Sequence, residues 1–250
     1  MFVGIDAGSR ATKLVGVNAA GDVVCRAHVD QSVKPAETAR MLLDQALKGV
    51  PLTRCVSTGY ARHLLPFADR AVTEITCHAR GCMALHPDVD AILEIGGQDS
   101  KYIALESGRV ADFMMNDRCA AGTGRFLETA AMRLALSLTE MEMPRKQGAV
   151  VSISSMCVVF AETEIIGLVS NNAAPIEIMR GVQHAIAQRV VAMMGERRSA
   201  MPNVVFTGGV AQVPGMRDAI EAALRCSVQV PEFPQYTGAL GAALMAREMK

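Results

Sequence analysis

The sequence contains no tryptophan, and its only aromatic residues are seven phenylalanines and three tyrosines. Its 25 basic side chains are balanced by 25 acidic ones. Proteins that bind single-stranded nucleic acid stack the bases on aromatic rings, and binding to anionic polymers or membranes uses a basic patch. No apolar run approaches the ~18 residues that a membrane span needs. The composition therefore argues against nucleic-acid binding and against membrane insertion.

Two common nucleotide motifs are also missing. The chain has no GxxxxGK[ST] segment, and no GxGxxG follows its first predicted strand. These absences disfavour a P-loop protein and a dinucleotide-binding fold. With 250 residues, half of them hydrophobic, the chain can form one compact α/β unit or two small lobes.

Seven cysteines are present, and Met1 leads directly into a predicted strand rather than an export signal. We therefore expect a cytoplasmic protein whose cysteines are thiols or metal ligands rather than disulfides. For Cys25, Cys55 and Cys226, which lie in strand-like apolar runs, packing as small hydrophobic side chains is the expected role. Cys77 and Cys82 lie on a predicted helix, where packing is again favoured.

One pattern occurs twice along the chain: a strand, a glycine-rich turn with an aspartate, and a second strand. Thr12–Val15 (TKLV) aligns with Ser100–Ile103 (SKYI) at an offset of 88 residues (12 to 100). We predict a duplicated β-hairpin core, one copy in each lobe of an α/β fold. Apolar spacing predicts helices at Ala36–Leu47, Glu74–His86 and near the C-terminus.

The first glycine-rich turn, GIDAGSRATK, favours a phosphate site with magnesium. Backbone N–H groups of such a turn can surround phosphate oxygens. An aspartate at a strand end can hold Mg²⁺ through water, and a lysine adds a point charge for phosphate. The candidate residues are Asp6, Gly8, Ser9, Thr12 and Lys13.

Two further turns complete the pattern. In GGQDSK, Asp99 can share the metal and Gln98 can orient an attacking water; Gly96, Gly97 and Lys101 complete this turn. Gly208, Gly209 and Val210 form the third turn, where glycine lets the backbone approach a flat nucleoside. Each turn alone is typical of ordinary loops, but the three in this order indicate a nucleotide site.

Cys119 and Cys157 are 38 residues apart (119 to 157), each beside a predicted helix. A helix N-terminus offers unpaired N–H groups that favour a thiolate. An iron–sulfur cluster takes about four thiolates, so two chains related by a two-fold axis would supply them. Buried packing is the alternative, and spacing alone leaves both interpretations open.

The three turns together resemble the nucleotide-binding fold shared by actin, Hsp70 chaperones and sugar kinases. The resemblance implies a ribonuclease H-like, two-lobed ATPase that closes over ATP and Mg²⁺, with crossing helices at Glu74–His86 and Gly238–Lys250. The implied division is residues 1–73 with 238–250 as lobe I, 74–87 as a crossing helix, and 88–237 as lobe II with the two cysteines.

A more specific resemblance covers nearly the whole chain. Asn116–Glu128 (NDRCAAGTGRFLE) and Cys157–Ile165 (CVVFAETEI) resemble hallmark segments of the activator ATPases of 2-hydroxyacyl-CoA dehydratases, a family that includes the ATPase components of benzoyl-CoA reductases. Matching segments follow the same order: GIDAGSRATK, STGY, EITCHARG, EIGGQDSK, FTGGVA and PQYTGALGAAL. Thr163 and Val213 depart from the family pattern, the second near the expected adenosine pocket.

This resemblance implies a homodimer in which Cys119 and Cys157 hold one [4Fe–4S] cluster between the subunits. It further implies that ATP hydrolysis drives one electron, received from a ferredoxin or flavodoxin, to an iron–sulfur dehydratase or reductase under anaerobic conditions. Gln235 is implied in the ATP/ADP site. The alternatives are a small-molecule kinase, which gives the two cysteines no joint role, and a non-redox regulatory ATPase.

Overall fold

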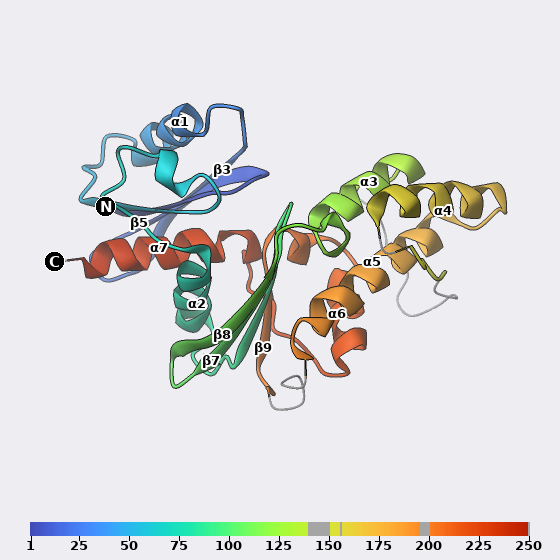
Figure 1. Cartoon of the computed structure of the whole chain (residues 1–250). Helices are drawn as coiled ribbons and strands as arrows, with labels where there is room; N and C mark the ends of the chain where they lie inside the picture. Colours follow the sequence, from blue (N-terminus) through green and yellow to red (C-terminus); the bar gives the residue numbers. More distant parts are fainter. Residues whose placement is uncertain (140–150, 156, 196–200, 250) are drawn as a thin grey trace. The chain divides into compact units, whose positions relative to one another are not determined.

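The computed structural model describes residues 1–139, 151–155, 157–195 and 201–249 (Figure 1). The chain forms two compact units. The first consists of Met1–Val89, Ile103–Asp112 and Glu232–Lys250, and the second of Asp90–Tyr102 and Phe113–Pro231. The implied division at residues 73, 87 and 237 stays a prediction.

A five-stranded sheet with the order β3-β2-β1-β4-β5 lies in the first unit. Its strands are β1 (Phe2–Ala7), β2 (Ala11–Val17), β3 (Val23–Asp30), β4 (Arg54–Thr58) and β5 (Arg70–Ala71). The first three strands form an antiparallel meander, whereas β4 runs parallel to β1. A parallel neighbour requires a crossover, and α1 (Pro35–Leu47) lies in that connection.

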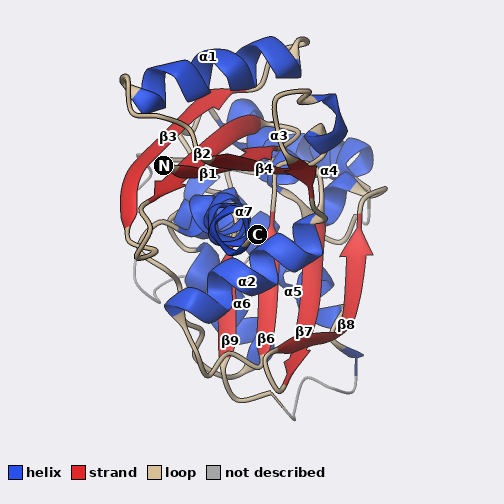
Figure 2. Cartoon of the chain, turned by 90° about the vertical axis from the view of Figure 1, so that its left-hand side faces the viewer, coloured by secondary structure: helices blue, strands red, loops and turns tan. Residues whose placement is uncertain are grey.

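Helices cover both faces of this sheet. On one face α1 contributes Leu42 and Leu43 to a core with Val3 and Ile5 of β1. On the other face α7 (Thr237–Glu248) packs its alanines against β2, so that α1 and α7 lie on opposite sides in Figure 2. The central strands β1 and β2 are accordingly almost fully buried, while the edge strand β3 alternates between half-buried and exposed residues.

Two helices of the first unit, α2 (Glu74–Leu85) and α7, pack with their backbones in close approach. A Cβ atom added at Gly241 would lie 1.8 Å from the Cys77 carbonyl oxygen, and one added at Gly81 would lie 2.1 Å from that of Thr237. Because no side chain fits at either position, this crossing depends on the two glycines. The predicted helices at Ala36–Leu47 and Glu74–His86 are confirmed within one residue.

A second sheet has the order β8-β7-β6-β9, which repeats the order β3-β2-β1-β4 of the first. Its strands are β6 (Ala91–Ile95), β7 (Ser100–Glu106), β8 (Arg109–Asn116) and β9 (Val204–Thr207). Strand β9 runs parallel to β6, as β4 does to β1. The predicted duplication of the hairpin core is therefore confirmed.

Four α-helices of the second unit follow the hairpin: α3 (Gly124–Leu134), α4 (Val158–Ser170), α5 (Pro175–Ala192) and α6 (Met216–Leu224). Helices α3 and α4 both pack against α5 (Figure 1). Short 3₁₀ turns lie in four of the connecting loops: η1 (Arg62–Leu64), η2 (Ala120–Gly122), η4 (Gly209–Gln212) and η5 (Pro234–Tyr236). Among the described helices, none is both long enough and apolar enough to cross a membrane.

Candidate functional site

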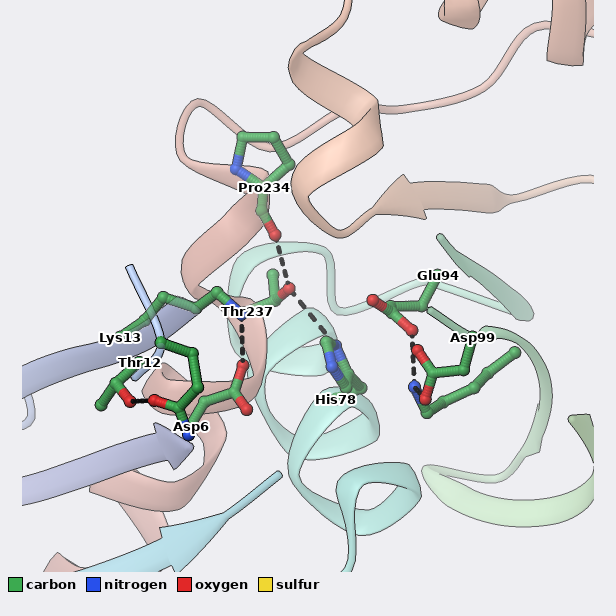
Figure 3. A network of polar contacts seen from close by, with 10 residues as sticks. Asp6, Thr12, Lys13, His78, Glu94, Asp99, Pro234 and Thr237 are labelled. Carbon is green, nitrogen blue, oxygen red and sulfur yellow. Dashed lines mark hydrogen bonds and ion pairs between the residues drawn. The ribbon is translucent and has the colours of Figure 1, made fainter. Parts of the chain in front are cut away.

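The first hairpin brings a carboxylate and an ammonium group together. Asp6 and Lys13 are register partners on β1 and β2, and Lys13 Nζ lies 3.1 Å from Asp6 Oδ2 (Figure 3). Gly8 closes the turn by donating its N–H to the Ala11 carbonyl at 3.2 Å. A Cβ atom at Gly8 would come within 3.0 Å of Lys13 Nζ. The glycine therefore leaves room beside the lysine ammonium.

Strand β4 ends beside the same carboxylate, at Thr58 and Gly59. Gly59 has a φ of +94°, and an added Cβ atom would lie 2.5 Å from Asp6 Oδ1 and 2.6 Å from the Ala7 carbonyl group. Both the left-handed backbone and the lack of space require glycine here. The sequence indicated this STGY segment only through its family resemblance, not as part of the phosphate turn.

In the second hairpin, the lysine lies between two carboxylates. Lys101 Nζ is 2.8 Å from Glu94 Oε2 and 2.7 Å from Asp99 Oδ2 (Figure 3). The Lys101 side chain is only 2% exposed. A buried ammonium is tolerated where it is paired in this way. This burial favours a structural role for Lys101 over the predicted contact with a nucleotide phosphate.

The turn in the second hairpin has the same backbone design as the first. Gly96 donates its N–H to the Asp99 carbonyl at 3.0 Å, as Gly8 does to Ala11. Gly208, at the end of the parallel strand β9, has a φ of +92°. A Cβ atom there would lie 2.3 Å from the Ile95 carbonyl oxygen and 2.7 Å from Glu94 Oε1. Gly208 therefore lies against Glu94 in the same way that Gly59 lies against Asp6.

Sequence reasoning missed Glu94 as a site residue. The offset of 88 residues maps Asp6 onto Glu94, and it maps Ala11, not Asp6, onto Asp99. The signal was present, because Lys13 and Lys101 follow their strand-end acids at the same spacing. Asp99 is therefore an additional carboxylate without a counterpart in the first hairpin.

The remaining candidates in the turns differ in exposure. Gln98 is exposed at the tip of its turn, while Ser9 is half-buried. Thr12 is buried and donates its hydroxyl to Gln31 Oε1 at 2.6 Å. Gln235 Oε1 and Ser100 Oγ are buried atoms without a hydrogen-bond partner among the described residues. Such atoms are expected to bind a ligand or a water, which fits the implied place of Gln235 in a nucleotide site.

The two candidate cluster ligands are exposed and stand at helix starts. Cys119 directly precedes η2, and Cys157 is the N-cap of α4. Asn116 holds Cys119 from both sides: its Oδ1 accepts the Cys119 N–H at 3.0 Å, and its Nδ2 donates to the Cys119 carbonyl at 2.8 Å. Exposed thiols beside unpaired helix N–H groups suit an anionic cluster.

The other cysteines behave differently. Cys55, Cys77 and Cys82 are buried, as predicted, and Cys25 is half-buried. Burial is the main cause that raises the pKa of the Cys55 and Cys77 thiols to about 12. The prediction that Cys226 packs in the core is wrong, because this residue is exposed just after α6 ends. An apolar neighbourhood in sequence does not show on which side of a loop a thiol lies.

The start of α3 is hydrogen-bonded to the second glycine-rich turn. Gly124 donates its N–H to the Gly96 carbonyl at 2.9 Å, and Arg125 donates to the Gly97 carbonyl at 2.8 Å. A Cβ atom at Gly124 would lie 3.0 Å from the Gly96 carbonyl oxygen. The turn that contains Gln98 and Asp99 is thus attached directly to the helix that follows Cys119.

The segment before Cys157 is fixed by a carboxylate from α4. Glu164 accepts hydrogen bonds from the Ser154 N–H, the Ser154 hydroxyl and the Ser155 N–H, all at 2.9 Å. Burial tends to raise the pKa of Glu164, but these hydrogen bonds outweigh it and lower the pKa to about 2. Glu164 is therefore ionised at neutral pH and holds this segment against α4.

The duplicated α/β fold, with its glycine turns and strand-end acid–lysine pairs, defines an actin-like nucleotide-binding protein. The family description "BadF/BadG/BcrA/BcrD ATPase family" matches residues 3–246, and the chain belongs to this family. It is 41% identical over 253 residues to the activator of lactoyl-CoA dehydratase of Anaerotignum propionicum, covering 98% of this chain and 97% of that protein.

Two further proteins support this assignment. The (R)-2-hydroxyglutaryl-CoA dehydratase activating ATPase of Acidaminococcus fermentans is 38% identical over 250 residues, covering 98% of this chain and 96% of that protein. The solved structure of the activator of the 2-hydroxyisocaproyl-CoA dehydratase from Clostridium difficile, with bound ADPNP, superposes with a TM-score of 0.92 at 37% identity. That match covers 99% of this chain and 95% of the other.

Proposed function

We propose that this protein is an ATP-dependent electron donor. As a homodimer with one bridging [4Fe–4S] cluster, it would couple ATP binding and hydrolysis to the transfer of one electron. The acceptor would be a 2-hydroxyacyl-CoA dehydratase or a related aryl-CoA reductase, and the source a ferredoxin or flavodoxin. The family, the dehydratase activators among its relatives and the two exposed cysteines support this proposal.

The nucleotide roles follow the two hairpins. Asp6 and Asp99 would hold Mg²⁺ through water, and Glu94, the strand-end acid of the second hairpin, would hold Lys101 beside Asp99. The backbone of Gly8, Ser9, Gly96 and Gly97, with Lys13, would contact the phosphates, and Gln98 would orient the attacking water. Thr12, which is buried, would instead hold the first turn through its hydrogen bond to Gln31. Gly208, Gly209, Val210 and Gln235 would bind the nucleoside. Lys101 would act by holding Glu94 and Asp99 in place.

Dimerisation is supported by the surface of α4. The helix is apolar on most of its sides, yet the residues it buries are Ala161 and Ile165. Val159, Phe160, Ile166 and Val169 are exposed, starting two residues after Cys157. An exposed apolar patch of this kind is typical of a protein interface. A second copy packed here would bring two more thiolates to the cluster.

The observation that carries the proposal is the pair of hydrogen bonds between the second phosphate turn and α3. A conformational change of Gly96 and Gly97 on nucleotide binding would displace the Gly124 and Arg125 N–H groups that are hydrogen-bonded to them. The same helix start is preceded by η2 and Cys119. Coupling of this kind requires that the nucleotide bind the two arrangements with different affinity. The chain thus contains a short covalent and hydrogen-bonded route from turn to thiol.

The test is iron and acid-labile sulfide per dimer, measured on protein purified without oxygen. We expect about four irons per dimer in the wild type, and loss of iron in both Cys119→Ser and Cys157→Ser. Cys226→Ser is the matched control, because this thiol is also exposed and should leave the iron content unchanged. A wild type without iron after reconstitution would contradict the electron-donor proposal and favour a kinase or a plain ATPase.

A further inference from the structure

Arg189 on α5 connects the segment that follows Cys119 with the segment that precedes Cys157. Its Nη1 donates to the Ala121 carbonyl at 3.3 Å, and its Nη2 donates to the Ser155 carbonyl at 3.0 Å. Ala121 lies two residues after Cys119, and Ser155 lies two residues before Cys157. One guanidinium group therefore ties the two cysteine segments to each other, although they are far from Arg189 in sequence.

The chemistry of this contact needs arginine. Its planar guanidinium carries several N–H donors in a fixed fork, whereas a lysine ammonium is a single point on a flexible stem. Within the described ranges no carboxylate pairs with Arg189, so its donors serve the two carbonyl groups. Each segment also has its own anchor, Asn116 beside Cys119 and Glu164 beside Ser155. Arg189 is the link between these two local arrangements.

We propose that Arg189 is a positioning residue that fixes the Cys119 and Cys157 segments relative to each other, so that both ligands of one chain form one unit toward the cluster. This inference rests on the proposed function. It adds a second step to the route from the phosphate turn. A shift of the α3 start that moves η2 would be passed through Ala121 and Arg189 to Ser155, and both cysteines would respond together.

Three variants of the full-length dimer test this role. Arg189→Met removes the fork and the charge, Arg189→Lys keeps the charge but can serve one carbonyl at a time, and Arg217→Met is the control. Arg217 lies in the same unit and makes an exposed ion pair with Glu221 on α6, a kind of pair that contributes little. The readouts are iron per dimer, the EPR spectrum of the reduced cluster, the rate at which a chelator extracts iron, and the melting temperature.

Removal of an outer-shell partner typically weakens metal binding by about 10- to 100-fold. For Arg189→Met we accordingly expect iron extraction at least about tenfold faster than in the wild type, together with an altered EPR spectrum. The iron extraction rate of Arg189→Lys should fall between those of Arg189→Met and the wild type, and that of Arg217→Met should match the wild type. This graded order is expected only if the fork geometry itself sets the cluster environment.

The remaining outcomes are decisive as well. If Arg189→Met binds iron with the wild-type spectrum and extraction rate, the inference is overturned while the proposed function stands. If Arg189→Met does not fold, a folded Arg189→Lys with wild-type spectrum and extraction overturns it equally. A wild type without iron would instead overturn the proposed function, and the inference would fall with it.

Discussion

The two hairpins share one design but differ in how they hold their lysine. In both, a strand-end acid meets a lysine seven residues later, a glycine N–H closes the turn, and a left-handed glycine from a parallel strand stands against the acid. In the first hairpin the Lys13 and Asp6 side chains are 18% and 9% exposed. In the second, Lys101 and Glu94 are 2% and 6% exposed, and Asp99 adds a second carboxylate.

The difference assigns separate tasks to the two copies. Lys13 is partly exposed beside Asp6, whereas Lys101 is enclosed by Glu94 and Asp99. The second hairpin is also the one attached to α3 through Gly96 and Gly97. A buried, paired charge makes that turn resistant to local distortion, because displacing either partner exposes an uncompensated charge. On the proposed function, the first copy would contact the phosphate and the second would pass the resulting change on to α3.

Lys101→Met should have the largest effect, because it leaves Glu94 and Asp99 close together without their cation. Breaking a buried ion pair by removing one partner destabilises by about 3–5 kcal/mol. Urea unfolding of the variant and of the wild type measures the difference. The matched control is Lys34→Met, whose partner Glu37 is 70% exposed and whose loss should change the unfolding free energy by less than about 1 kcal/mol. Equal effects of the two substitutions would contradict the proposed division of tasks.

The left-handed glycines come next. Gly59→Ala and Gly208→Ala both force a residue with a Cβ atom into a left-handed backbone and push it against backbone and carboxylate atoms. Backbone strain alone should destabilise by about 1–2 kcal/mol, and the clash should add about 1–3 kcal/mol. Gly49→Ala separates the two causes, because Gly49 has a φ of +84° but no atom within 4 Å of the added Cβ.

Nucleotide binding should then distinguish the glycine variants. Since Gly59 and Gly208 stand against Asp6 and Glu94, both alanine substitutions should weaken MgATP binding in calorimetry, whereas Gly49→Ala should bind as the wild type does. Unfolding free energies that are equal in all three variants would show that strain, not crowding at the acids, requires the glycines.

Lys13→Met should reverse the pattern of Lys101→Met. Its side chain is partly exposed, so its contribution to the unfolding free energy should be small. A hydrogen bond to a charged group contributes about 1.5–3 kcal/mol, so MgATP affinity should fall by about 10- to 100-fold. Calorimetric titration with MgATP, beside urea unfolding, gives both quantities. A variant that loses stability but keeps its affinity would place Lys13 in a structural role like that of Lys101.

Much of this arrangement could be predicted from the sequence, because it is local. Strand–turn–strand patterns and an offset of 88 residues identified both hairpins and their glycines. The burial of Lys101 could not be predicted, because the same spacing gives a partly exposed pair in the first copy. The sequence difference that hinted at this burial is Asp99, which occupies the position equivalent to Ala11 of the first hairpin.

Contacts between segments that are far apart in the chain could not be predicted from the sequence for a different reason. The hydrogen bonds from Gly124 and Arg125 to Gly96 and Gly97 join backbone atoms, which carry no residue-specific signal. The contacts of Arg189 join a side chain to carbonyl groups 68 and 34 residues away. Periodicity and motif spacing describe neighbours along the chain, whereas these contacts exist only once α3, α5 and the turn are packed.

Gly124→Ala should have the smallest effect on stability and the most selective effect on function. The added methyl group would lie 3.0 Å from the Gly96 carbonyl oxygen and 3.1 Å from Val210 Cγ2, so the start of α3 must shift by a few tenths of an ångström. Alanine is preferred over glycine by about 1 kcal/mol in helix interiors, and Gly124, the first residue of α3, gains only part of this, which offsets some of the crowding.

The nucleotide dependence of iron extraction is the quantity that should change. In the wild type the extraction rates with MgADP and with MgATP should differ, by about fivefold or more if the coupling is in the usual range. In Gly124→Ala their ratio should move toward one while MgATP still binds. Arg217→Met is the control, because it removes only an exposed ion pair with Glu221 on α6. An undiminished ratio in Gly124→Ala would mean that the turn and Cys119 communicate by some route other than the start of α3, and the second hairpin would lose its assigned task.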